Sequence, residues 1–159
     1  MDRADKRPPA GFTLGPHEVG GVPHPAIAAT VPSRLTLALP LPRHGVFHAF
    51  VAIADPPAGA RTAAVRLRVG VSDHRIYEGL TAVTLVPGNR AWTEIRTDLS
   101  AYAGWKWSLF YRPERTVWRL VLAADATDDA PGTVLWGGPE IVTDTQSARE
   151  YTARRQQFR

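Results

Sequence analysis

Residues 92–104 read WTEIRTDLSAYAG, and this stretch places a strand, a short turn and a glycine directly after one another. Uncharged side chains alternate here with charged ones, with Ile95, Thr97 and Leu99 set against Glu94, Arg96 and Asp98. A period of two predicts a strand with one buried face and one solvent face. Ser100 is placed to cap a single helical turn through Tyr102, and Gly104 to end it.

Downstream of this stretch, the same alternation predicts two more strands. In residues 117–125, Trp118, Leu120 and Leu122 point to one side, and the residues between them point to the other. The segment 135–141, LWGGPEI, then supplies an aromatic residue, two glycines and a proline before a last strand.

Upstream, alternation and turn residues predict further short strands from residue 34 onward. The strands of the whole chain are marked by Leu35, Val46, Val65, Ile76, Val83, Trp92, Val117 and Val134 or Ile141. Eight to nine short strands at such spacings, with no amphipathic helix among them, are typical of an all-β sandwich.

The composition divides the chain into three parts. Residues 1–32 are rich in proline and glycine, which forbids a helix and discourages a central strand, so an extended lead-in or a linker is expected there. Residues 33–143 form the predicted β-sandwich domain. Residues 144–159 form a basic tail of helix-forming composition, with Ser147 and Glu150 at capping-box spacing.

The order of the motifs resembles the closing half of galactose-binding-like β-sandwich modules. The motifs are W-x-x-I-x-x-DLS-x-YAG, an L-x-L strand ending in aspartate, and W-G-x-P-x-I, all within residues 92–141. The resemblance implies an antiparallel jelly-roll β-sandwich of about eight to nine strands, galactose-binding-domain-like, with Trp92, Trp118 and Trp136 in its core. It further implies a non-catalytic accessory module that recognises carbohydrate or glycan.

The chain departs from the resembling modules after Gly104, where WKWSLFYRPERT is inserted before the next strand. Aromatic rings beside hydrogen-bonding groups suit the C–H face of a sugar or the apolar patch of a partner protein. The candidate ligand- or partner-binding residues are Trp105, Trp107, Phe110, Tyr111, Arg112 and Arg115. Three interpretations stay open: a plug at one end of the sandwich, a contact with a partner or second copy, and a sugar platform.

Composition excludes several classes of function. The chain has no cysteine, so disulfides and thiolate sites are absent, and no apolar run is long enough to cross a bilayer. The charged start of the chain lacks the apolar segment of a secretory signal. The net charge is +4, but the arginines are spread through strands and both tails, so no nucleic-acid partner is expected.

No motif points to catalysis. The sequence contains no GxSxG, no HExxH and no phosphate-binding glycine loop, so an enzyme is not expected. A carboxylate pair among Glu78, Glu94 and Glu114, acting on glycosides, is the minority hypothesis. The main alternative to carbohydrate recognition is a structural or protein–protein assembly role that uses residues 105–116 and the C-terminal tail.

The acidic residues are expected to act locally. Asp98 is predicted to accept hydrogen bonds from the backbone amides of the following turn. Asp125, Asp128 and Asp129 offer only three of the six or more oxygens that calcium requires. No cofactor is therefore expected, with a structural calcium ion as the alternative.

Overall fold

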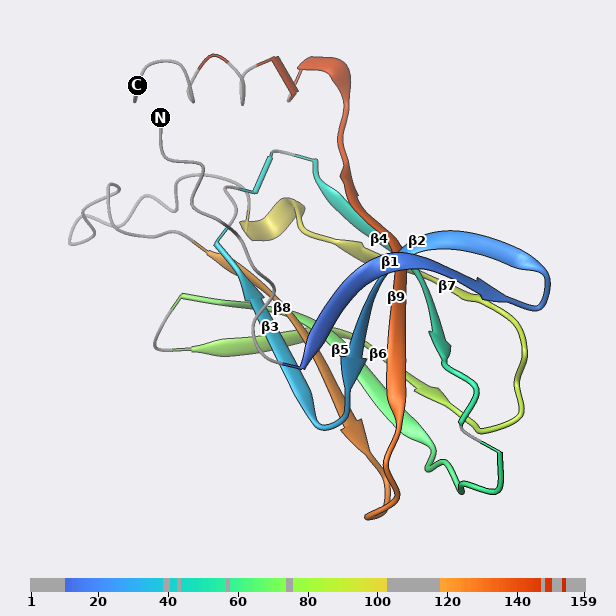
Figure 1. Cartoon of the computed structure of the whole chain (residues 1–159). Coiled ribbons are helices and arrows are strands. Elements are labelled where there is room, and N and C mark those ends of the chain that lie inside the picture. Colours follow the sequence, from blue (N-terminus) through green and yellow to red (C-terminus); the bar gives the residue numbers. More distant parts are fainter. Residues whose placement is uncertain are drawn as a thin grey trace.

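The structure is a computed structural model that describes residues 11–38, 41–42, 44–56, 58–73, 76–102, 118–146, 148–149 and 153. In these residues the chain forms an antiparallel β-sandwich of nine strands, arranged as two sheets that pack face to face (Figure 1). The expected fold class, an all-β sandwich of about eight to nine strands, is thereby confirmed.

The five-stranded sheet has the order β1–β2–β9–β4–β7. Its strands are β1 (Phe12–Val19), β2 (Val22–Thr30), β9 (Thr133–Val142), β4 (Val46–Ile53) and β7 (Thr93–Asp98). The four-stranded sheet has the order β3–β8–β5–β6, with β3 (Ser33–Leu37), β8 (Arg119–Ala126), β5 (Val65–Ser72) and β6 (Tyr77–Leu85). A single 3₁₀ turn, η1 (Ser100–Tyr102), follows β7.

The hydrophobic core lies between the two sheets and is built from alternate residues of each strand. The five-stranded sheet contributes Phe47 and Trp136, and the four-stranded sheet contributes Leu67, Leu120 and Leu122; all are almost completely buried. Because successive side chains of a strand point to opposite faces, each of these strands also projects a row of side chains away from the core.

The stretch 92–102 folds as its sequence pattern predicts. Ile95, Thr97 and Leu99 are buried, whereas the charged residues between them are exposed. The one polar member, Thr97, is satisfied by donating its hydroxyl to the hydroxyl oxygen of Thr81 at 2.8 Å. A single helical turn then follows at η1, as the sequence indicates.

The turn after β7 is organised by Asp98, as predicted. Its Oδ1 accepts the backbone N–H of Ser100 at 2.8 Å. Hydrogen bonds from the Ser100 hydroxyl and from the Ser100 backbone lower the pKa of the Asp98 carboxyl below its ordinary value of 3.8, because they favour the ionised form.

The three tryptophans predicted to lie in the core differ in position. Trp136 is buried in the core, and Trp118 is partly buried and packs against the core. Trp92 does not join the core: its ring lies on the outer face of the five-stranded sheet, where a Cβ on Gly137 would be only 2.9 Å from it. Its indole N–H donates to the carbonyl of Val22 at 2.8 Å. The missing side chain of Gly137 makes this outer position available.

The largest difference from the sequence analysis lies in the segment assigned to the lead-in. Residues 12–30 form β1 and β2, and β2 is a central strand because it pairs with both β1 and β9. The prolines at 16, 23 and 25 are tolerated because β9 pairs with β2 only from Ala26 onward. Those prolines therefore lie where β2 pairs with β1 alone, so fewer backbone N–H groups are needed for hydrogen bonds between strands.

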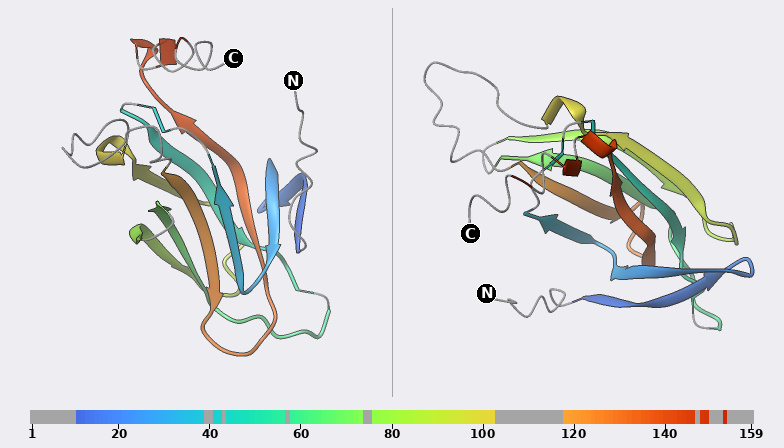
Figure 2. Two further views of the ribbon diagram at one scale, coloured as in Figure 1. Left: turned by 90° about the vertical axis from the view of Figure 1, so that its left-hand side faces the viewer. Right: turned by 90° about the horizontal axis from the view of Figure 1, so that it is seen from above.

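The far end of this hairpin, residues 16–25, is referred to below as the arm. Figures 1 and 2 show the arm extending beyond β9 toward the start of β7. Gly20, at the tip, has a φ of 60°, and a Cβ there would overlap the carbonyl oxygen of Arg90. Glycine is required at this contact because both the backbone conformation and the close approach exclude a side chain.

In the C-terminal tail, the described residues after β9 have helical backbone at positions 145, 146, 148, 149 and 153. The N–H of Ala148 donates to the carbonyl of Asp144 at 3.0 Å, the spacing of an α-helical hydrogen bond.

The core position of Leu122 is testable by truncation. Leu122→Ala is expected to lower the free energy of unfolding by about 2–5 kcal/mol, because it removes buried methyl groups and leaves a cavity. Leu14→Ala is the matched control, since Leu14 is 66% exposed; it should change the free energy by less than about 0.5 kcal/mol. Urea unfolding measures both, and equal effects would contradict the assigned core.

The lowered pKa of Asp98 predicts a pH-dependent contribution to stability. Because the folded-state pKa lies below the unfolded value, the ionised carboxylate stabilises the fold above that unfolded value, and this stabilisation is lost as the pH falls through the folded pKa. Asp98→Asn should therefore lower the melting temperature at neutral pH and have less effect in strong acid. Asp129→Asn, at an exposed carboxylate, is the control and should show no such trend.

Candidate functional site

The six binding residues proposed from the sequence, Trp105, Trp107, Phe110, Tyr111, Arg112 and Arg115, lie outside the described residues. The residues on either side of that segment are described. Tyr102 and Trp118 meet edge to face with ring centroids 5.1 Å apart, and both pack against the core. Burial and a hydrogen bond to the Glu78 carboxylate raise the pKa of Tyr102 to about 12.

The outer face of the four-stranded sheet gathers arginines from three neighbouring strands. Its outward residues include Arg34 from β3, Arg66 and Arg68 from β5, Tyr77 from β6, and Arg119 and Asp125 from β8. We refer to these six residues as the basic face. Antiparallel register brings them together across the strands: Arg34 and Arg68 flank Ala123, and Arg66 lies opposite Asp125.

Tyr77 is the aromatic residue of the basic face, and its ring lies across the neighbouring strand. A Cβ on Gly70 would be 2.7 Å from ring atom Cε2 and 2.8 Å from the hydroxyl, so only glycine leaves room for the ring. The guanidinium carbon of Arg34, from the opposite edge of the sheet, is 5.1 Å from the ring centroid. This distance is within the range of a cation–π contact, and Tyr77 still remains 36% exposed.

The charges of the basic face are only partly compensated. Asp125 forms an ion pair with Arg68. Among the described residues, no carboxylate forms an ion pair with Arg34, Arg66 or Arg119. The Nε atoms of Arg68 and Arg119 are buried without a hydrogen-bond partner, and such donors are costly to leave unsatisfied. The face therefore presents unused guanidinium donors around an accessible aromatic ring.

A second polar cluster lies on the outer face of the five-stranded sheet. His48 lies between two carboxylates: its Nδ1 is 3.0 Å from Glu140 Oε1, and its Nε2 is 2.9 Å from Glu94 Oε1. Arg96 Nη1 also donates to that Glu94 oxygen at 3.4 Å. The imidazole is only 14% exposed and both of its nitrogens are engaged, so its hydrogen-bonding capacity is used within the protein.

Aromatic rings beside this cluster hold the arm in place. His24 of the arm stacks on Phe50 with ring centroids 4.5 Å apart and meets the edge of Trp92 at 5.0 Å. His48 meets Phe50 edge to face at 5.1 Å. These contacts connect β2, β4 and the start of β7. They therefore account for the aromatics of this face by packing, without a ligand.

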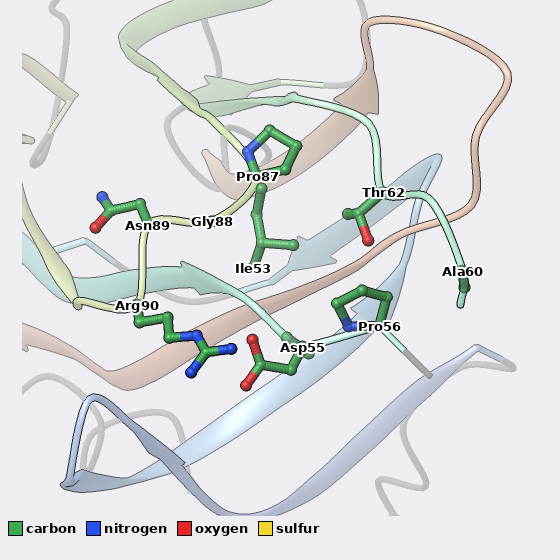
Figure 3. A pocket seen from close by; sticks show the side chains of 10 residues that line it. Ile53, Asp55, Pro56, Ala60, Thr62, Pro87, Gly88, Asn89 and Arg90 are labelled. Atoms are coloured by element: carbon green, nitrogen blue, oxygen red, sulfur yellow. The ribbon is translucent and has the colours of Figure 1, made fainter. Parts of the chain in front are cut away.

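A shallow hollow of about 250 Å³ opens at one end of the sandwich, between the segment after β4 and the turn after β6. Asp55 and Arg90 extend toward one another across it, and Thr62 lies at its side (Figure 3). The hydroxyl oxygen of Thr62 is buried without a hydrogen-bond partner. The hollow is smaller than typical small-molecule pockets, which measure about 300–1,000 Å³, and two of its lining residues are prolines.

The basic face is not predicted as a unit from the sequence. Its arginines are spread along the chain, since Arg34, Arg66 and Arg119 are far apart in sequence. Each of these arginines occupies an outward position in a strand of alternating residues, so the sequence pattern indicates that it faces away from the core. Which strands are neighbours is decided by the order β3–β8–β5–β6, which brings the arginines onto one surface.

The contact between Arg34 and Tyr77 is testable by a double-mutant cycle. We expect Arg34→Ala and Tyr77→Ala to be coupled by about 0.5–1 kcal/mol in free energy of unfolding, the range of an exposed cation–π pair. Urea unfolding of the two single variants and the double variant measures this coupling. The pair Arg61→Ala and Tyr77→Ala is the control, and a coupling no larger than in that control would refute the contact.

The described residues contain no group of three or more His, Cys, Asp or Glu side chains arranged to hold a metal ion. Two of the three acidic residues considered for calcium form ion pairs: Asp125 pairs with Arg68, and Asp128 pairs with Arg61 at 3.2 Å. In the same part of the chain, no helix has the length and apolar character needed to cross a bilayer. No protein-family model matches the chain, and no curated protein matches it.

Proposed function

We propose that the protein is a non-catalytic binding module for carbohydrate and that the basic face is its binding surface. The observation that carries this proposal is the exposed ring of Tyr77, held across Gly70 among arginines of three strands. An aromatic ring offers an apolar surface to the C–H face of a sugar, and guanidinium groups donate hydrogen bonds to its oxygens.

The shape of the surface supports a polymeric ligand. The face belongs to an antiparallel sheet, and its outward Arg34, Arg66 and Tyr77 are exposed to solvent. Neighbouring strands lie about 4.8 Å apart, so side chains on β3, β8 and β5 offer contacts across about 10 Å. An extended chain of sugars can meet such a surface along its length.

The fold agrees with the resemblance between residues 92–141 and galactose-binding-like modules. The antiparallel β-sandwich is the architecture that the resemblance implies, and a role as an accessory module follows from the same resemblance. One fold can carry many unrelated functions. The side chains of the basic face are therefore the main support for carbohydrate recognition, and the fold is additional support.

The alternative is an assembly module that contacts another protein. Exposed large apolar residues do occur among the described residues, but apart from the neighbours Ile76 and Tyr77 they are scattered over several elements: Leu14, Val22, Val86 and Val142. Single exposed apolar side chains are ordinary on protein surfaces and do not form a contiguous patch. Carbohydrate recognition therefore explains the described surface better than protein docking does.

A glycan array with the full chain, followed by calorimetric titration of the glycans retained, tests the proposed function. We expect saturable binding that falls about tenfold or more in Tyr77→Ala, because the stacking surface is lost. Tyr77→Phe keeps the ring and should retain most of the affinity. Arg34→Ala provides a second test of the same surface, should Tyr77→Ala unfold.

Glu18→Gln, on the arm, is the control variant and should bind as the unchanged protein does. In the same assay, Trp105→Ala and Trp107→Ala test the residues proposed from the sequence. Loss of binding in these variants, with full binding in Tyr77→Ala, would move the site away from the basic face. No saturable glycan binding, together with concentration-dependent self-association, would favour assembly.

A further inference from the structure

We infer that the carbohydrate recognised by the basic face is anionic, carrying carboxylate or sulfate groups. The inference rests on the proposed function and adds the chemical class of the ligand. It is carried by an excess of arginines over carboxylates on one sheet face, three of them without an ion pair among the described residues, together with the cation–π contact between Arg34 and Tyr77.

The first argument is the local charge. The outward positions of β3, β8, β5 and β6 carry four arginines and a single carboxylate, Asp125, which leaves a charge of +3 on one face. The outer face of the other sheet carries three carboxylates, Glu94, Asp98 and Glu140, beside one arginine, Arg96. A neutral sugar can accept hydrogen bonds from these arginines but is not attracted by their net charge, whereas an anionic sugar is both attracted and oriented by it.

The second argument is the choice of arginine. A guanidinium group is planar and can donate two parallel hydrogen bonds to a carboxylate or a sulfate, which an ammonium group cannot do with the same geometry. The guanidinium carbon of Arg34 lies over the Tyr77 ring, 5.1 Å from its centroid, and no carboxylate of the described residues forms an ion pair with this guanidinium group. Arg119 adds donors on the neighbouring strand β8, and Arg66 adds donors on β5, the next strand after it.

The third argument concerns burial. The Nε atoms of Arg68 and Arg119 have no acceptor and no access to water in this arrangement. An arriving anion that pairs with these guanidinium groups allows the side chains to shift and gain partners. Relief of the free-energy cost of these two unsatisfied donors then contributes to the free energy of binding.

The test uses three polymers with one backbone: dextran, carboxymethyl-dextran and dextran sulfate. We expect dextran sulfate, carboxymethyl-dextran or both to bind the full chain at least about tenfold more tightly than dextran does. The two charged polymers distinguish sulfate from carboxylate as the preferred group. Arg66→Ala combined with Arg119→Ala should weaken binding of the preferred polymer about tenfold or more, and Arg66→Lys combined with Arg119→Lys should restore only part of it.

The control removes the same amount of charge elsewhere. Arg61 and Arg96 are exposed and lie outside the basic face, so Arg61→Ala combined with Arg96→Ala should change the affinity by less than about twofold. An equal loss in this control would show that net charge alone drives binding and would overturn the inference. The melting temperature of each variant confirms that it is folded.

Further outcomes separate this inference from the proposed function. If dextran or another neutral glycan binds as tightly as the charged polymers and Tyr77→Ala abolishes that binding, carbohydrate recognition stands and the anionic class is wrong. If single-stranded DNA or polyglutamate of matched charge binds as tightly as dextran sulfate, the face is a general polyanion surface and both proposals fail. If none of the polymers or glycans binds, both fail as well.

Discussion

The pairing of β8 between β3 and β5 is the interaction on which the rest of the structure depends. On one side of β8, Leu120 and Leu122 enter the core that holds the two sheets together. On the other side, the same pairing places Asp125 opposite Arg66, Arg119 opposite Ser72, and Ala123 between Arg34 and Arg68. The stability of the sandwich and the layout of the basic face therefore follow from one set of backbone hydrogen bonds.

The two outer faces of the sandwich differ in chemistry because the core separates them. Packed sheets lie about 10 Å apart, so the outward residues of one sheet do not pair with those of the other. On the outer face of the five-stranded sheet, His48 lies between Glu94 and Glu140, and the arm packs on Phe50. On the four-stranded sheet, Arg34, Arg66 and Arg119 form no ion pair with a carboxylate among the described residues, and our proposed function rests on this difference.

The local sequence pattern predicted correctly those strands whose residues alternate between the core and solvent. It predicted the strand and turn at residues 93–102 and the role of Asp98, because these features depend on near neighbours in the chain. It was a poor guide to β1 and β2, because their prolines argue against a central strand. Proline is tolerated in β2 only where β9 does not pair with it. The local sequence does not show how far that pairing extends, because it depends on the length of the partner strand.

The sequence by itself determined the class of the fold, the alternation of buried and exposed residues in most strands, and the supply of arginines, since all of these follow from residue type and spacing. Only the tertiary structure decided that Trp92 leaves the core for the space above Gly137, and that Arg34 reaches Tyr77 across the sheet. The physical reason is that strand order and register bring distant residues into contact, and both are set by how two whole sheets share one core.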